Sequence, residues 1–330
     1  MKLALFNTKS YDRIYFNRYN TSHSLKFFDS PLNSESVELL NGYEGVCVFV
    51  NDQLDATVIG QLAAKNVKII ALRCAGFNNV DLKAAQNQGI AVVRVPAYSP
   101  HAVAEHAIAL IMTLNRKTHK AYNRVREGNF SLERLTGFDI FGKTVGVIGT
   151  GKIGEAFAKI IKGFGCRVLA YDLHPNPELV AFGVEFVSLN DLYALSDIVS
   201  LHCPLTPQTN RLINADTLQL MKPNAMLINT SRGGLIDTKA VINALKSGHL
   251  GYLGIDVYEQ EADLFFNDFS ESIIQDDVLM RLMSFPNVLI TAHQGFFTEE
   301  ALTQIAQTTF QNLADFEAGK LNPYTTLVLP

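Results

Sequence analysis

The chain has 330 residues, of which 48% are hydrophobic and 18% are charged, and its formal net charge is −4. A chain this apolar can bury enough surface to offset the entropy cost of folding, which excludes disorder. The acidic balance leaves no surplus of Lys and Arg for a basic face, so no nucleic-acid partner is expected. The length fits about two domains of roughly 150 residues.

Other sequence features exclude a membrane span, a disulfide framework and a metal site. The four cysteines, Cys47, Cys74, Cys166 and Cys203, form no CxxC pair. The N-terminal apolar run stops at Phe6, which is too short for a secretory signal. No stretch approaches the length of a transmembrane helix. We therefore expect a soluble, cytoplasmic protein without a bound metal.

The first hundred residues alternate short apolar runs with helix-compatible segments. Near-continuous apolar runs are typical of strands that are buried on both faces of a parallel sheet. Asp81 is placed to cap a short helix. The predicted strands are residues 2–6, 25–28, 46–50, 67–72 and 91–95.

A long helical pattern then covers residues 101–130, and Gly128 is placed to end it. Residues 103–114 are apolar nearly all round, which predicts burial between domains or between subunits. Burial between subunits would suit a homodimer or a homotetramer.

A second alternation of strands and helices fills the rest of the chain. Asn214 and Asp237 are placed as helix N-caps, and Gly248 is placed to follow a helix. A last helix is expected to open at Thr298 and to run to Gly319. The predicted strands are residues 144–149, 167–172, 184–187, 197–202, 225–230, 251–256 and 287–292.

This alternation predicts the α/β class, with two Rossmann-like or flavodoxin-like parallel-sheet domains. The last helix follows the end of the second sheet, so we expect it to return to the first domain. The predicted domains are residues 1–100 with 298–330, which form a discontinuous unit, and residues 101–297.

A glycine-rich turn joins a predicted strand to an amphipathic helix. Gly149, Gly151 and Gly154 have the G-x-G-x-x-G spacing, which lets the chain turn tightly and lets a pyrophosphate approach the helix N-terminus. Asp172 closes the next strand, where a carboxylate binds ribose hydroxyls. Its charge repels a 2′-phosphate, which favours NAD over NADP. The glycines alone leave SAM and other adenosine ligands open.

Polar side chains follow three later strands, where ligands bind in such sheets. They are Arg232, the group of Asp256, Glu259 and Glu261, and His293. Arginine can hold a carboxylate by two parallel hydrogen bonds, and histidine can transfer a proton. Each residue alone also fits a structural role, but their combination after a dinucleotide turn favours a catalytic site.

These motifs resemble those of the D-isomer-specific 2-hydroxyacid dehydrogenases, and most of all the bacterial fermentative D-lactate dehydrogenases within that family. The resemblance spans nearly the whole chain. The matching stretches are residues 73–82, 93–116, 145–154, 201–209, 229–237, 254–261 and 291–301.

The resemblance implies reversible hydride transfer between NADH and pyruvate to give D-lactate, in a cleft between the two domains. Residues 1–100 with 298–330 would bind the substrate, and residues 101–297 would bind NAD. It implies that Arg232 binds the substrate carboxylate and carbonyl, that His293 is the acid/base, and that Glu261 hydrogen-bonds and tunes His293. Cofactor contacts are implied at Gly149, Gly151, Lys152, Ile153, Gly154, Asp172, Cys203, Pro204, Thr209, Thr230, Ser231, Arg232 and Asp256. Substrate contacts are implied at Phe49, Ala75, Gly76, Tyr98, Arg232 and Phe296.

Other functions stay open at this point. Phe49, Phe296 and Phe297 predict an apolar pocket wall, which suits the methyl group of pyruvate but also admits other 2-oxo acids. The alternative enzymes act on phenyllactate, 2-hydroxyisocaproate or glycerate. An NAD-sensing or corepressor module and an adenosine-dependent hydrolase or methyltransferase are alternatives from other classes. The spacing of His106 from the preceding histidine does not match the HExxH metal-binding motif. His202 is expected beside the cofactor loop.

Overall fold

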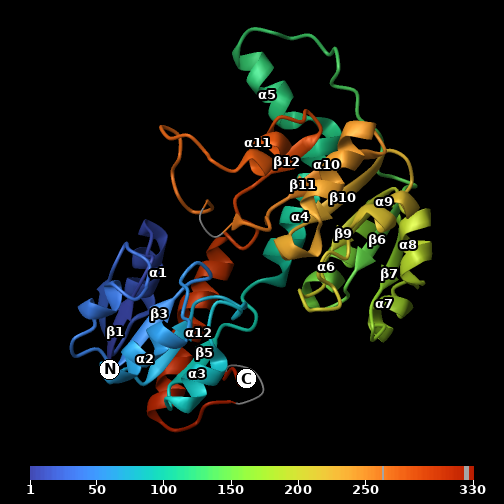
Figure 1. Ribbon diagram of the computed structural model, residues 1–330. Coiled ribbons are helices and arrows are strands. Elements are labelled where there is room, and N and C mark those ends of the chain that lie inside the picture. The colour runs from blue at the N-terminus through green and yellow to red at the C-terminus, as the bar shows by residue number, and fades with distance from the viewer. Residues whose placement is uncertain (262–263, 323–326) are drawn as a thin grey trace. The chain divides into compact units, whose positions relative to one another are not determined.

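The computed structural model describes residues 1–261, 264–322 and 327–330. The chain divides into two compact units (Figure 1). Unit 1 comprises Met1–Ser99 and Phe296–Pro330, and unit 2 comprises Pro100–Gly295. The predicted borders, after residues 100 and 297, lie one and two positions further along the chain. Among the described residues, no helix is both long and apolar enough to cross a bilayer.

Unit 1 is built on five parallel strands in the order β2-β1-β3-β4-β5. This is the flavodoxin-like order, with its switch point between β1 and β3. The strands are β1 (Lys2–Leu5), β2 (Ser24–Phe27), β3 (Gly45–Val48), β4 (Ile69–Leu72) and β5 (Ala91–Arg94). The helices are α1 (Ser10–Tyr19), α2 (Ala56–Ala64), α3 (Leu82–Asn87) and α12 (Glu299–Glu317), with a 3-10 turn at Ser36–Leu39.

Two elements of unit 1 can be compared with the predictions, the last helix α12 and the strand β2. The last helix, α12, packs against α1, β4 and β5, so the C-terminal segment belongs to the first unit as predicted. The strand predicted at residues 25–28 is not buried on both faces. Its counterpart β2 alternates exposed and half-buried side chains, because β2 forms an edge of the sheet.

Unit 2 is built on seven parallel strands in the order β12-β11-β10-β9-β6-β7-β8. This is the Rossmann order extended by one strand, with its switch point between β6 and β9. The strands are β6 (Thr144–Ile148), β7 (Arg167–Tyr171), β8 (Glu185–Phe186), β9 (Ile198–Leu201), β10 (Ala225–Asn229), β11 (Leu250–Ile255) and β12 (Val288–Ile290).

Helices cover both faces of this second sheet. One apolar core lies under α4 (Pro100–Arg116), α6 (Lys152–Lys162) and α7 (Pro177–Ala181). The other lies under α8 (Leu189–Leu195), α9 (Ala215–Leu220), α10 (Thr238–Ser247) and α11 (Asp277–Met283). Burial on both faces explains why the strands of unit 2 read as nearly unbroken apolar runs.

The single helix predicted over residues 101–130 is interrupted: α4 ends at Arg116 and α5 (Thr118–Arg126) follows it. The predicted end is confirmed, because Gly128 follows α5 with a φ of +76°. Between α4 and α5, Lys117 has a φ of +50°, in the left-handed region, and its Nζ donates to the carbonyls of Arg134 and Thr136. Most apolar side chains of α4 pack against α6, β10 and β11 in the core of unit 2, whereas Ile108 and Met112 are half-buried and Ala109 is exposed.

The predicted helix caps are confirmed. The side chains of Asp81, Asn214, Asp237 and Thr298 each accept a hydrogen bond from a backbone N–H in the first turn of the following helix. Gly248 ends α10 with a φ of +75°, a conformation that glycine adopts without a steric penalty. These five local signals therefore set the start or end of four helices.

Candidate active site

The glycine-rich turn follows β6, at the switch point of the sheet of unit 2. Gly149 has a φ of +92°, and a Cβ there would lie 2.6 Å from the backbone nitrogen of Cys203. A Cβ at Gly154 would lie 1.9 Å from the carbonyl oxygen of Gly149, whereas one at Gly151 would meet nothing within 4 Å. The turn is therefore closed behind Gly149 and Gly154 and open at Gly151, as the approach of a pyrophosphate requires.

Asp172 comes directly after β7 beside this turn. One oxygen accepts hydrogen bonds from Thr150 N (2.6 Å) and Thr150 Oγ1 (3.0 Å), and the other accepts from His174 N (3.0 Å). Burial raises the pKa of Asp172, but these hydrogen bonds outweigh burial and lower it overall. The protein thus fixes a carboxylate where ribose hydroxyls of NAD would need acceptors.

The remaining predicted cofactor residues lie at the same edge of the sheet. Lys152 and Ile153 form the first turn of α6. On the loop after β9, Thr209 Oγ1 donates to Pro204 O (2.7 Å), and Ser231 Oγ donates to Cys203 O (2.7 Å). Thr230 Oγ1 is buried and has no hydrogen-bond partner among the described residues. This orphaned hydroxyl, the open turn and Asp172 together fit an NAD molecule.

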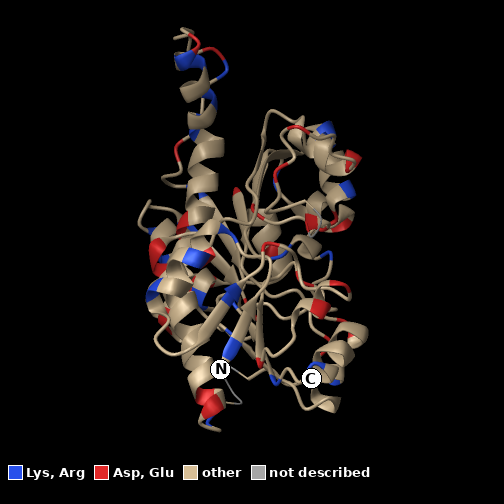
Figure 2. Ribbon diagram, turned by 90° about the vertical axis from the view of Figure 1, so that its left-hand side faces the viewer, with Lys and Arg blue, Asp and Glu red and all other residues tan. Residues whose placement is uncertain are grey.

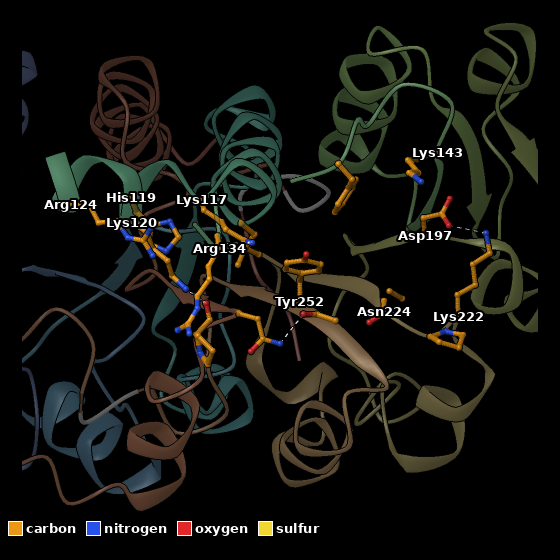
Figure 3. Close-up of a pocket in the computed structure, with 17 residues that line it drawn as sticks. Lys117, His119, Lys120, Arg124, Arg134, Lys143, Asp197, Lys222, Asn224 and Tyr252 are labelled. Carbon is orange, nitrogen blue, oxygen red and sulfur yellow. Dashed lines mark hydrogen bonds and ion pairs between the residues drawn. The ribbon is translucent and has the colours of Figure 1, made fainter. Parts of the chain in front are cut away.

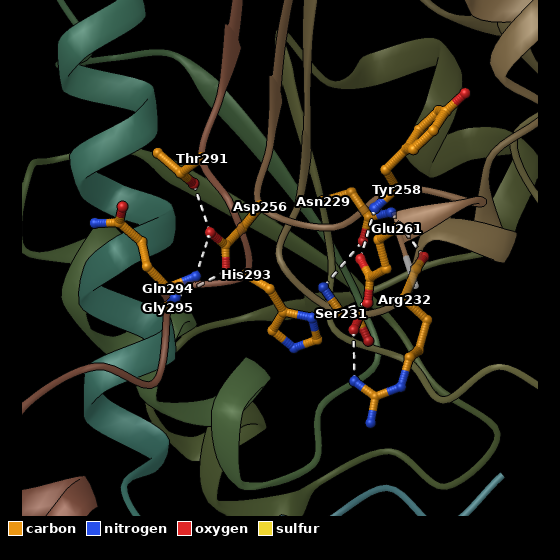
Figure 4. A network of polar contacts seen from close by, with 10 residues as sticks. All are labelled: Asn229, Ser231, Arg232, Asp256, Tyr258, Glu261, Thr291, His293, Gln294 and Gly295. Atoms are coloured by element: carbon orange, nitrogen blue, oxygen red, sulfur yellow. Dashed lines mark hydrogen bonds and ion pairs between the residues drawn. The ribbon is translucent and has the colours of Figure 1, made fainter. Parts of the chain in front are cut away.

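Glu261 and His293 form a hydrogen-bonded pair, seen in Figure 4. They follow β11 and β12, which are neighbouring strands. His293 Nδ1 lies 2.8 Å from Glu261 Oε1, and Glu261 Oε2 accepts from the backbone N–H of Tyr258 (2.9 Å). Because a carboxylate can only accept, His293 Nδ1 carries the proton of this bond. The other ring nitrogen, Nε2, is then the atom left for a substrate.

The backbone of His293 is held in an unusual conformation. Its φ is +52°, a region that costs energy for a residue with a Cβ. His293 N donates to Asp256 O (2.8 Å), and the Asp256 carboxylate accepts from Gln294 N (2.9 Å) and Gly295 N (2.8 Å). Asp256 therefore positions the turn that carries His293, in addition to its predicted place near the cofactor.

Sequence reasoning missed two partners of Asp256. His106 Nε2 lies 2.9 Å from Thr291 Oγ1 and 3.3 Å from Asp256 Oδ1, and Thr291 Oγ1 donates to Asp256 Oδ1 (2.5 Å). Burial raises the pKa of Asp256, but its hydrogen bonds with His106, Thr291 and Gly295 lower it overall. The position of His106 on α4, far from Thr291 in sequence, gives no local signal of this contact.

Arg232 follows β10, the next strand of the sheet. Asn229 Nδ2 donates to the carbonyl of Arg232 (2.8 Å), and Arg232 Nη1 donates to the carbonyl of Ser231 (2.7 Å). In the part of the chain that the structure describes, Arg232 has no ion pair. A Cβ at Gly233 would lie 2.1 Å from the carbonyl carbon of Tyr258. Only glycine lets the Arg232 loop approach the loop that carries Glu261 this closely.

The predicted substrate residues other than Arg232 lie in unit 1. Phe49 follows β3, Ala75 and Gly76 follow β4, and Tyr98 follows β5, so all four stand at the carboxyl edge of the first sheet. The ring of Phe296 lies 5.9 Å from that of Phe49 and 6.1 Å from that of Tyr98. The structure therefore brings the predicted residues together as two groups, one in each unit.

His202 lies behind the glycine turn, as expected, and is buried. Its Nε2 lies 2.9 Å from Ser200 Oγ, its ring is 4.7 Å from that of Phe157, and burial lowers its pKa from 6.5 to about 3. Between these pH values the unfolded chain binds a proton at this position and the folded chain does not. Neutral His202 therefore contributes stability that is lost as the pH falls below about 6.5.

We expect His202→Gln to flatten the decline of stability with falling pH. The difference in slope approaches about 1.4 kcal/mol per pH unit below pH 6.5, because one group stops titrating. Urea denaturation at several pH values between 7.5 and 4.5 measures it. Ser200→Ala is the control, since it removes the hydrogen bond and retains the histidine. An unchanged slope in His202→Gln would contradict the assignment.

Comparisons with known proteins agree with this geometry. The family model for the NAD-binding domain of D-isomer specific 2-hydroxyacid dehydrogenases matches residues 108–295. The chain is 58% identical to 2-hydroxyacid dehydrogenase A of Aspergillus oryzae over 321 residues, which cover 96% of this chain and 92% of that protein. It is 55% identical to D-lactate dehydrogenase of Escherichia coli over 325 residues, which cover 98% and 99% respectively.

A solved structure of a related protein with bound NAD has a similar fold. The structure of D-lactate dehydrogenase from Aquifex aeolicus complexed with NAD and lactic acid is 32% identical, covers 99% of both chains and has a TM-score of 0.86. The chain thus belongs to the D-isomer-specific 2-hydroxyacid dehydrogenases and is an NAD-dependent oxidoreductase.

Proposed function

We propose that the enzyme is a D-lactate dehydrogenase that interconverts pyruvate and D-lactate. The observation that carries this proposal is the His293–Glu261 pair, 2.8 Å apart, on the strand ends next to Arg232. A proton-transferring group and a carboxylate-binding group are the two functions that a 2-oxo acid reductase must supply. The relatives named D-lactate dehydrogenase support the choice of substrate.

The three residues have distinct roles in this proposal. NADH supplies the hydride when it is bound. During reduction, His293 Nε2 donates a proton to the carbonyl oxygen of the substrate, and during oxidation it accepts the hydroxyl proton. Glu261 stabilises the imidazolium through Nδ1. The guanidinium of Arg232 holds the substrate carboxylate by two parallel hydrogen bonds and so orients the reacting carbon.

In this proposal the residues that contact NAD lie at the same edge of the sheet. Gly149, Gly151 and Gly154 receive the pyrophosphate, with Lys152 and Ile153 in the first turn of α6, and Asp172 receives the ribose hydroxyls. Asp256 stands next to His293 on the nicotinamide side. The remaining contacts are assigned to Cys203, Pro204, Thr209, Thr230, Ser231 and Arg232.

The aromatic cluster of unit 1 favours a small substrate side chain. Phe49 and Phe296 are both less than a tenth exposed. The void of about 10 Å³ between them and Arg73 is lined by residues of α1 and α12, so the two rings are packed into the interior of unit 1. In the proposal these rings and Tyr98 border the methyl group of pyruvate, and the Ala75–Gly76 turn offers backbone N–H groups to the carboxylate. A phenyl or isobutyl group would need the rings to move.

Initial rates of NADH oxidation with a panel of 2-oxo acids test this proposal. We expect pyruvate to give the highest kcat/KM and chiral chromatography to identify the product as D-lactate. A higher kcat/KM with phenylpyruvate, 2-oxoisocaproate or hydroxypyruvate would replace lactate by the corresponding D-2-hydroxy acid. No oxidation with any 2-oxo acid would instead favour an NAD-sensing binding module.

We also propose that the enzyme is a homo-oligomer. Large apolar side chains are exposed on α5 and on the segment that follows it, and such a concentration is typical of an interaction surface. They are Tyr122, Val125, Phe130, Leu132 and Phe141. This segment joins residues 103–114 as a candidate contact with another subunit. In that range Leu110, Ile111 and Leu114 are buried within unit 2, whereas Ile108 and Met112 are half-buried and Ala109 is exposed.

A further inference from the structure

Asp256 is a buried carboxylate next to the turn that carries His293. Residues of both charges are spread over the helices and loops of the chain (Figure 2), but Asp256 is only 2% exposed. In the part of the chain that the structure describes, no Lys or Arg side chain forms an ion pair with it. Burial raises the pKa of Asp256, but its hydrogen bonds with His106 and Thr291 help to lower it overall, so the carboxylate is ionised.

The donors around the Asp256 carboxylate come from one short segment of the chain (Figure 4). Oδ1 accepts from Thr291 Oγ1 (2.5 Å) and Gln294 N (2.9 Å), and Oδ2 accepts from Gly295 N (2.8 Å). A Cβ at Gly295 would lie 3.0 Å from Asp256 Oδ2 and 3.5 Å from His106 Cδ2. The carboxylate and the ring of His106 therefore enclose this segment closely.

The direction of the hydrogen bonds assigns a proton to His106 Nε2. Thr291 has one hydroxyl hydrogen, and that hydrogen is donated to the Asp256 carboxylate, which can only accept. His106 Nε2 lies 2.9 Å from Thr291 Oγ1 and 3.3 Å from Asp256 Oδ1, and neither oxygen has a hydrogen left to donate to it. Nε2 therefore carries the proton and donates to Thr291 Oγ1. The hydrogen bonds run in one direction, from His106 through Thr291 to Asp256.

At its other end this series of hydrogen bonds holds a strained turn. His293 has a φ of +52°, and its backbone N–H donates to the carbonyl of Asp256 (2.8 Å). The next two residues, Gln294 and Gly295, donate to the carboxylate of the same Asp256. A left-handed conformation at a residue with a Cβ persists only where the surrounding contacts enforce it. The orientation of Asp256 therefore fixes the backbone from which the His293 imidazole extends.

We propose that His106 is a positioning residue for the proton transfer by His293, and that it acts through Thr291 and Asp256. The inference rests on the acid/base role of His293 in the proposed function. The N–H of His106 orients the Thr291 hydroxyl, and this hydroxyl fixes the rotation of the Asp256 carboxylate. The carboxylate then holds residues 293–295 in the conformation that places the imidazole for reaction.

Initial rates of the full-length enzyme test the proposal, with NADH and the 2-oxo acid that gives the highest kcat/KM. His106→Leu and Thr291→Val each remove one hydrogen bond of the series, and each should lower kcat about tenfold. The KM for the 2-oxo acid should change little, because Arg232 lies on another loop. The Kd for NADH should also change little, because the glycine-rich turn and Asp172 remain intact.

Conservative variants distinguish this role from a loss of packing. Thr291→Ser keeps the hydroxyl, and His106→Gln keeps an N–H donor, so both should have a kcat close to that of the wild type. The double variant His106→Leu/Thr291→Val should lower kcat by clearly less than the product of the two single effects, because both residues act on one carboxylate. The control His249→Gln should keep the wild-type kcat. Melting temperatures establish that every variant folds.

Three results would overturn the proposal. The first is a wild-type kcat in His106→Leu, and the second is a double-variant effect equal to the product of the single effects. The third is an equal loss of kcat in His106→Gln and His106→Leu, which would assign the effect to packing of the ring. A wild-type kcat in His293→Gln would instead refute the acid/base role in the proposed function, and that variant is measured separately. All rates are ratios to the wild type with one 2-oxo acid, so the identity of the preferred substrate does not affect them.

Discussion

Replacing His293 with glutamine lowers kcat for pyruvate reduction by about 10²–10⁴-fold, the range expected when a positioned proton donor is lost. Glutamine can still form hydrogen bonds, but its amide neither releases nor accepts a proton in this pH range. The cofactor residues lie on the turn after β6 and on neighbouring strand ends, so the Kd for NADH should change little. The two effects are therefore separable in one variant.

Stopped-flow or steady-state assays measure kcat, and the fluorescence of NADH itself measures its binding, because the chain contains no tryptophan. His249→Gln is the matched control: His249 also lies in unit 2 and contacts Leu218 O (2.9 Å) through Nε2. This control should keep wild-type turnover. If His293→Gln instead loses turnover and NADH affinity to the same extent, His293 positions the cofactor and does not transfer the proton.

The cofactor side of the site was largely predictable because its signals are local. Gly149, Gly151 and Gly154 lie within six residues. The structure leaves no room for a side chain at Gly149 and Gly154, and it leaves the turn open at Gly151. Arg232, Glu261 and His293 were predictable because neighbouring parallel strands end at one edge of the sheet. Their proposed roles depend on the resemblance to the family as well as on this geometry, and kinetic experiments test those roles.

The features that sequence reasoning missed depend on contacts between distant residues. The helix breaks at Lys117, whose backbone is left-handed and whose ammonium group donates to the distant carbonyls of Arg134 and Thr136, so helical periodicity gives no signal of the break. His106 contacts Thr291, which lies 185 positions away in the sequence. Lys117, Lys143 and Lys222 likewise line one pocket of unit 2 (Figure 3), although they lie far apart in the sequence.

A second large effect is expected when the contact between Arg232 and the substrate carboxylate is removed. Two charge-assisted hydrogen bonds, each contributing about 1.5–3 kcal/mol, connect it to the guanidinium of Arg232 in the proposed mechanism. Their loss in Arg232→Gln corresponds to a fall of about 10²–10⁴-fold in kcat/KM for pyruvate. Arg232→Lys should lie between this variant and the wild type, because it retains the charge without the paired geometry.

Folding should survive this change, which keeps the test informative. Arg232 Nη1 donates only to the adjacent Ser231 carbonyl among the described residues, so little stability depends on it. Arg211→Gln is the matched control, since Arg211 forms an exposed pair with Glu259 at 3.5 Å, and such pairs contribute about 0–1 kcal/mol. A wild-type kcat/KM for pyruvate in Arg232→Gln would show that another group binds the carboxylate. A rise in the Kd for NADH equal to the loss in kcat/KM would assign Arg232 to the cofactor alone.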